Sequence, residues 1–132
     1  MKVAVTSTGE SLNDLVDPRF GRCPFFLIVD TETMETEVVA NASTGVAHGA
    51  GISAAQSVAS KGVKTVITGN VGPNAYQALS AAGVDVVLGA RGTVAETVEA
   101  YTSGALDPAS QPTVGGHFGQ SGRGRGRGRR RE

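Results

Sequence analysis

The C-terminal segment limits how much of this chain can fold, because residues 122–131 consist only of glycine and six arginines. Sequence of this kind has no apolar side chain to bury and is typical of disordered arms that bind polyanions. The charge divides near the same place: residues 1–107 carry six basic and eleven acidic side chains, or −5, and residues 108–132 carry six arginines and one glutamate, or +5. We therefore expect one folded domain over residues 1–107 and a disordered cationic tail over residues 108–132.

The composition of the first 107 residues is typical of a small domain with a single hydrophobic core. The one cysteine, Cys23, excludes an internal disulfide and suits a reducing compartment. No apolar run approaches the roughly 20 residues that a membrane span needs. The N-terminus enters a strand pattern directly, without the features of a signal peptide. These observations predict a cytoplasmic protein that does not interact with membranes.

Strands and helices alternate in a recognisable order along the domain. Short apolar or alternating segments predict five strands, over residues 2–6, 25–29, 35–41, 65–68 and 84–88. Apolar residues at helical spacing predict three helices, which begin near Ile52, Pro73 and Val94. Thr93 and Glu96 match a capping box, in which the hydroxyl and the carboxylate satisfy opposite backbone amides at the start of the third helix.

The order β-β-β-α-β-α-β-α predicts an antiparallel hairpin followed by two right-handed crossovers, which place helices on both faces of a sheet. We therefore predict an α/β fold, a ribonuclease-H-like mixed five-stranded sheet with the first strand in the centre. Two-metal nucleases on such a sheet need carboxylates that converge on two cations. The first strand, the first helix and the strand over residues 65–68 carry none, and no catalytic triad is present, so we expect a protein that is not an enzyme.

Two glycine-rich segments are candidate anion sites. Residues 49–54 fit the pattern G-x-G-x-x-A at the start of a helix, but a dinucleotide fingerprint requires its first glycine directly after a strand. Here an eight-residue loop separates the preceding strand from the first glycine, so the pattern does not indicate a dinucleotide site. It still predicts that these glycines expose backbone amides to an anion. The turn over residues 69–73 offers similar amides at the C-terminal end of a strand, where open α/β sheets bind ligands.

The segment over residues 19–24 has the densest chemistry of the chain. Arg19 and Arg22 flank Cys23 in sequence, and a thiol beside guanidinium groups is expected to ionise readily and to bind soft metals. His48 can supply a second ligand if the fold brings it near this cysteine. The alternative is an inert cysteine close to the start of a strand, with His48 as an ordinary loop residue.

The segment over residues 17–30 resembles a known family, the proteins of dinitrogenase iron–molybdenum cofactor biosynthesis. The similarity continues through segments that begin at His48, Val66, Gly72 and Gly83, and it covers about residues 1–106. The family includes nitrogenase cofactor carriers. The resemblance implies a ribonuclease-H-like fold without nuclease activity, the binding of iron–sulfur or molybdenum-containing clusters, and cluster-assembly or acceptor proteins as partners.

The resemblance also implies a set of cofactor-binding residues in three loops of this chain. The thiol of Cys23 and the imidazole of His48 would be the metal ligands, since one cysteine cannot ligate a conventional four-cysteine cluster alone. The complete set of implied cofactor-binding residues is Arg19, Arg22, Cys23, His48, Gly49, Gly51, Gly69 and Asn70.

Three functional hypotheses follow. The first is a non-enzymatic carrier for an anionic iron–sulfur or iron–molybdenum (heterometal) cluster. The second is storage of iron sulfide through self-assembly of the Arg-rich tail, because one branch of the family resembles an iron–sulfur storage protein with a cationic tail. The third is nucleic-acid binding by the tail, which is weaker because Phe118 is the only aromatic residue in the tail available for base stacking.

Overall fold

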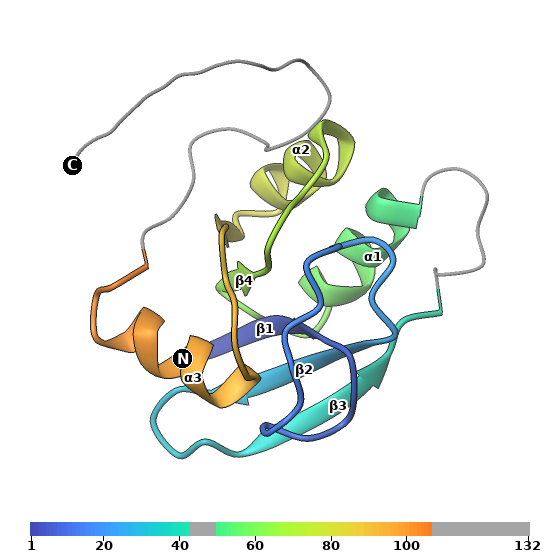
Figure 1. The fold of residues 1–132 in the computed structure, drawn as a ribbon. Coiled ribbons are helices and arrows are strands. Elements are labelled where there is room, and N and C mark those ends of the chain that lie inside the picture. The colour runs from blue at the N-terminus through green and yellow to red at the C-terminus, as the bar shows by residue number, and fades with distance from the viewer. Residues whose placement is uncertain (43–49, 107–132) are drawn as a thin grey trace.

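The computed structural model describes residues 1–42 and 50–106, in which helices pack around a central sheet (Figure 1). In chain order the elements are β1 (Lys2–Ser7), β2 (Phe25–Asp30), β3 (Thr36–Ala40), α1 (Ala50–Ala59), β4 (Thr65–Ile67), α2 (Pro73–Ala81), β5 (Asp85–Val87) and α3 (Val94–Thr102). Every predicted element is present, with small differences at the ends. The predicted disordered tail lies outside the described residues. None of the helices in the described ranges is long and apolar enough to cross a membrane.

The sheet is mixed, and its strand order is β3-β2-β1-β4-β5. β1 lies in the centre, antiparallel to β2 and parallel to β4, so that Val5 is opposite Leu27 on one side and Ile67 on the other. β2 pairs with β3 in an antiparallel hairpin, and β4 pairs with β5 in parallel. The predicted fold class and the central position of the first strand are confirmed.

Helices cover both faces of the sheet. Ala4 of β1 belongs to the core beneath α1 and α2, which includes Val58 and Leu79. Val3 and Val5, which alternate with Ala4 along the strand, belong to the core beneath α3. Because the central strands are buried on both faces, they consist of nearly continuous apolar residues.

The start of α3 confirms the predicted capping box. The Thr93 hydroxyl accepts a hydrogen bond from the Glu96 backbone amide at 3.1 Å, and the Glu96 carboxylate accepts one from the Thr93 amide at 2.9 Å. These bonds satisfy two amides that a helix start otherwise leaves without partners. A further hydrogen bond, from the Val94 amide to the Asp14 carbonyl, holds the beginning of α3 next to the loop that follows β1.

Candidate functional site

The loop between β1 and β2 is hydrogen-bonded to the turn after β4. The Asn70 amide donates to the Pro18 carbonyl at 2.8 Å and the Phe20 amide donates to the Asn70 carbonyl at 3.3 Å, so that Arg19 and Asn70 form a parallel bridge. The turn needs Gly69, because a Cβ there would lie 2.8 Å from the Pro18 Cα. The loop is therefore held at the C-terminal end of β4, the edge of an α/β sheet where ligands usually bind.

A groove of about 290 Å³ lies between this loop and the first turns of α1 and α2. Its size is close to the lower end of the range for small-molecule sites, which suits a compact ligand. The described residues that line the groove are Phe20, Gly21, Arg22, Ala50, Gly51, Ile52, Asn70, Val71, Gly72, Pro73, Asn74 and Ala75.

Glycines allow the three walls of this groove to approach one another. A Cβ at Gly21 would lie 3.1 Å from the Gly51 backbone nitrogen, and a Cβ at Gly51 would lie 3.0 Å from the Ala75 Cβ. Gly21 belongs to the loop, Gly51 to α1 and Ala75 to α2. Side chains at the two glycines would push these elements apart, so the glycines determine how closely the walls of the groove approach.

Two helices begin at the groove, and neither has an acidic residue in its first turn. The N-cap of α2 is Gly72, whose lack of a side chain leaves the first amides of the helix without a side-chain cap. Unpaired amides at a helix start carry partial positive charge and favour anions. The first turns of α1 and α2 therefore make the groove favourable for an anion.

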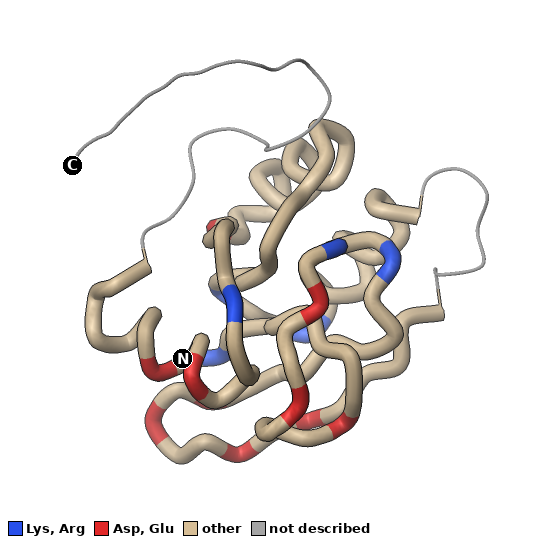
Figure 2. The backbone as a smooth tube through the Cα atoms, viewed as in Figure 1, with Lys and Arg blue, Asp and Glu red and all other residues tan. Residues whose placement is uncertain are grey.

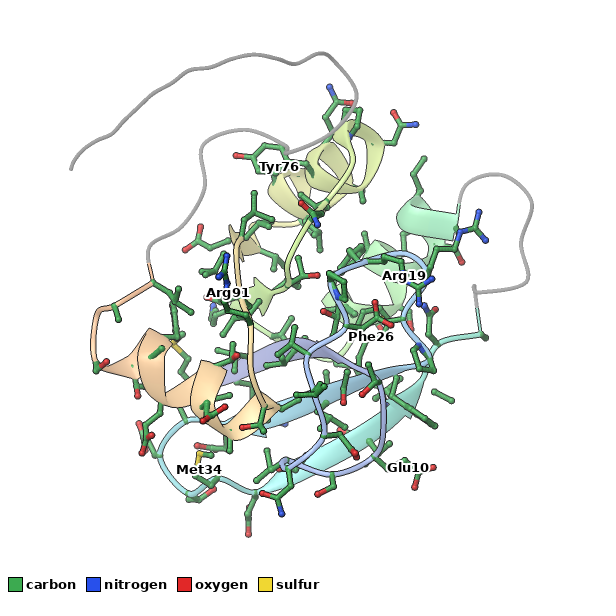
Figure 3. All side chains as sticks on the ribbon, viewed as in Figure 1. Glu10, Arg19, Phe26, Met34, Tyr76 and Arg91 are labelled. Carbon is green, nitrogen blue, oxygen red and sulfur yellow. The ribbon has the colours of Figure 1, made fainter. Side chains whose placement is uncertain are left out.

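The two arginines of the loop have different surroundings. Arg22 is exposed and is the one charged side chain among the described residues that line the groove. Arg19 lies beside the groove, on the loop next to α1 (Figure 3), and its guanidinium pairs with the Asp17 carboxylate at 3.1 Å. Burial alone would raise the pKa of Asp17, but the hydrogen bonds and charge of Arg19 outweigh burial and hold this pKa below its ordinary value.

The expectation that Cys23 ionises readily is wrong. Its side chain is completely buried in the core with Phe20 and Phe26, and its thiol donates a hydrogen bond to the Phe20 carbonyl at 3.3 Å. Burial, and to a smaller extent the negative charge of Asp17, raises the pKa of Cys23 to about 12. Proximity in sequence was misleading, because the loop turns the thiol inward and Asp17 compensates the charge of Arg19. The thiol cannot reach a ligand in the groove while the loop keeps this conformation.

The predicted site residues therefore fall into four groups. Arg22, Gly51 and Asn70 line the groove. Arg19 and Gly69 lie beside it, and Cys23 lies in the core behind it. The remaining two, His48 and Gly49, lie outside the described residues. Across residues 1–42 and 50–106, no group of three or more His, Cys, Asp or Glu side chains is arranged to hold a metal ion.

Two buried polar residues support the site, and the sequence did not single them out. Asp17 is 2% exposed and holds Arg19. Asn41, at the end of β3, donates from its side-chain amide to the Cys23 carbonyl at 2.8 Å and to the Gly21 carbonyl at 3.3 Å. Asp17 lies two residues before its partner, so a local signal was available. Asn41 contacts residues 18 to 20 positions away, and no local pattern indicates such a contact.

The comparison with known protein families now identifies the domain. The model of the family described as "Dinitrogenase iron-molybdenum cofactor" matches residues 1–104. The chain belongs to this family. An uncharacterised protein of Methanocaldococcus jannaschii is 33% identical over 98 residues, which cover 72% of this chain and 83% of the relative.

Solved structures of similar proteins agree with the family. The apo form of the orange protein from Desulfovibrio gigas is 45% identical, with a TM-score of 0.84, over 86% of this chain and 96% of that protein. A putative NifB protein from Thermotoga is 43% identical, with a TM-score of 0.76, over 87% of this chain and 98% of that protein. The resemblance inferred from residues 17–30 and the segments beyond is confirmed.

Proposed function

We propose that this protein is a non-enzymatic carrier for a small anionic iron–sulfur or molybdenum-containing cluster, which binds in the groove between the β1–β2 loop, α1 and α2. The observation that carries the proposal is the convergence of two helix starts and Arg22 on one groove. Membership of the iron–molybdenum cofactor family supports this class of ligand, and cluster-assembly or acceptor proteins are the partners that it suggests.

The groove offers hydrogen-bond donors rather than metal ligands. Sulfide ligands of an anionic cluster accept hydrogen bonds, so backbone amides and the Arg22 guanidinium match the surface of such a cluster. The Cys23 thiol is protonated and faces the core, so it is unsuited to bind a metal in this conformation. Attachment would therefore be electrostatic and reversible, which suits a protein that passes its ligand to an acceptor.

Direct metal coordination is a separate part of the proposal. Coordination by Cys23 requires the loop over residues 17–24 to open and the thiol to lose its proton. His48 precedes the first turn of α1, which lines the groove, by two residues in sequence, and it remains a predicted ligand. The order we propose is capture of the anion by the groove first, with coordination only after the loop moves.

Storage of iron sulfide is the second candidate function. It is favoured by the formal charge of +5 on residues 108–132, which would attract a polyanionic iron-sulfide polymer. In that case the tails of several chains would assemble around the polymer, and the folded domain would carry the tail. Nucleic acid is the less favoured polyanion, because Phe118 is the one aromatic residue of the tail.

The test uses the full chain and tetrathiomolybdate, a stable anionic metal sulfide, under anaerobic conditions. We expect the parent protein to bind the probe with a small fixed stoichiometry and Arg22→Gln to weaken binding about tenfold, the effect of losing a hydrogen bond to a charged group. Lys64→Gln is the matched control, because Lys64 is an exposed cation at the opposite, N-terminal end of β4. Equal losses in the two variants would show non-specific charge attraction and contradict a site in the groove.

A further inference from the structure

The Asp17–Arg19 pair has the geometry of a rigid support. The Asp17 carboxylate accepts three hydrogen bonds from Arg19: one from the backbone amide at 2.9 Å, one from Nε at 3.1 Å and one from a terminal guanidinium nitrogen at 3.1 Å. The side chain of Asp17 is 3% exposed and that of Arg19 is 64% exposed. A side-on pair of this kind fixes the plane of the guanidinium as well as its position.

The same pair connects the centre of the sheet to the wall of the groove. The Asp17 amide donates to the Thr6 carbonyl of β1, and the Thr6 hydroxyl bonds to the Asp17 carbonyl and to the Thr68 hydroxyl. On the other side, the backbone of Arg19 is bridged to Asn70, which lines the groove. The position of the loop in the groove wall thus depends on a chain of contacts that begins in the core.

The geometry assigns different roles to the two arginines of the loop, given the proposed function of the groove. Asp17 is a positioning residue: it neutralises Arg19 and locks it in place, so that the Arg19 backbone holds Asn70, which lines the groove, in position. Arg22 supplies the charge that attracts the ligand. Ligand affinity therefore depends on the fork geometry at Arg19 and on the positive charge at Arg22.

Substitutions can separate the effect of charge from the effect of geometry. Asp17, Arg19 and Arg22 together carry one net positive charge, and some variants keep this charge while they remove the side-on pair. Arg19→Lys keeps this charge and removes the fork, since an ammonium group cannot make the side-on pair. The double variant Asp17→Asn/Arg19→Gln also keeps it, because it removes one charge of each sign. Arg22→Lys keeps the charge at the groove, and Asp17→Asn raises the local charge by one.

The experiment measures binding of tetrathiomolybdate by the full chain between low and high salt, with thermal unfolding recorded for every variant. We expect Arg19→Lys and the double variant to bind about fivefold more weakly, the usual coupling between contacting residues, with unchanged dependence on salt. Arg22→Lys should bind more tightly than Arg22→Gln, because it keeps the positive charge at the groove. Asp17→Asn should make binding more salt-dependent, because an uncompensated cation is added beside the groove.

The outcomes separate this inference from the proposed function. Parent-like affinity in both charge-preserving variants, Arg19→Lys and the double variant, would overturn the positioning role of Asp17 while leaving the groove as the binding site. An unchanged salt dependence in Asp17→Asn would likewise overturn it, since a purely structural role of Asp17 predicts that result. Failure of the parent to bind the probe, with all variants folded, would contradict the proposed function and this inference together.

Discussion

At the scale of single residues, Cys23 shows how burial can outweigh composition. Two arginines within four positions suggested a reactive thiolate, yet the side chain has no exposed surface and the pKa is raised to about 12. A buried thiol of this kind behaves as a small apolar residue with a weak hydrogen-bond donor. The loop charge that lines the groove, and that we propose attracts the ligand, is at Arg22, one residue earlier in the sequence.

The raised pKa of Cys23 predicts a specific loss of stability at high pH. The pKa of the thiol is near its ordinary value of 9.0 in the unfolded chain and about 12 in the folded protein, so folding favours the protonated form. This stabilisation is lost as the pH rises between these values. Relative to Cys23→Ala, the parent should lose about 1.4 kcal/mol of unfolding free energy per pH unit in this window. Urea unfolding of both proteins from pH 8 to pH 11 measures the difference.

The Cys23→Ala variant serves as the control, because it removes the thiol and leaves every other side chain of the protein in place. Alkylation by iodoacetamide gives an independent check, since the native thiol should react far more slowly than the thiol in urea. Parallel stability curves together with fast native alkylation would show that the thiol is accessible, and would restore Cys23 as a metal ligand of the resting loop.

At the scale of elements, the sequence predicted the strands and helices well for a physical reason. The two faces of the sheet are buried by different helices, so β1 reads as an apolar strand, and glycines mark the ends of α2 and α3. The site was only partly predictable. Segments with glycines and arginines were found because their residue types are unusual, whereas the contacts of Asn41 and the inward turn of Cys23 arise from tertiary packing.

The contact between the β1–β2 loop and the turn after β4 can be tested through Gly69. An added Cβ would meet the Pro18 backbone at 2.8 Å, so Gly69→Ala should push the loop away and lower the unfolding free energy by about 1–3 kcal/mol, the usual cost of overpacking. Asn70→Ala is the control in the same turn, because the Asn70 contacts with the loop are made by its backbone. Urea unfolding measures both variants.

The expected difference is between one destabilised variant and one close to the parent. Asn70→Ala should change stability by less than about 0.5 kcal/mol, as is usual for exposed positions. Gly69→Ala should also speed alkylation of Cys23, because the same loop covers the thiol. Equal stability of the two variants would mean that the loop is not held against the turn.

At the scale of the whole molecule, charge is unevenly distributed. Acidic residues gather toward the β2–β3 turn and α3, whereas basic residues of the β1–β2 loop lie next to α1 (Figure 2). The domain is negative overall, so the anion binding that we propose depends on the local field of the groove rather than on net charge. The tail has the opposite sign, so its net charge favours binding of polyanions, whereas the net charge of the domain opposes it.

Removal of residues 108–132 separates the carrier function from the storage function. The described core residues end at Leu106, so the truncated protein should keep its thermal transition. With tetrathiomolybdate the truncated protein should retain a small fixed binding stoichiometry if the groove is the site.

With iron and sulfide, the full chain should form large assemblies and the truncated chain should not, provided that the tail gathers polymer. Salt should dissolve these assemblies, because exposed charges are screened within about 8 Å at physiological ionic strength and less at higher salt. Tight RNA binding by the full chain alone, without metal uptake by either protein, would instead support the nucleic-acid hypothesis and contradict both metal functions.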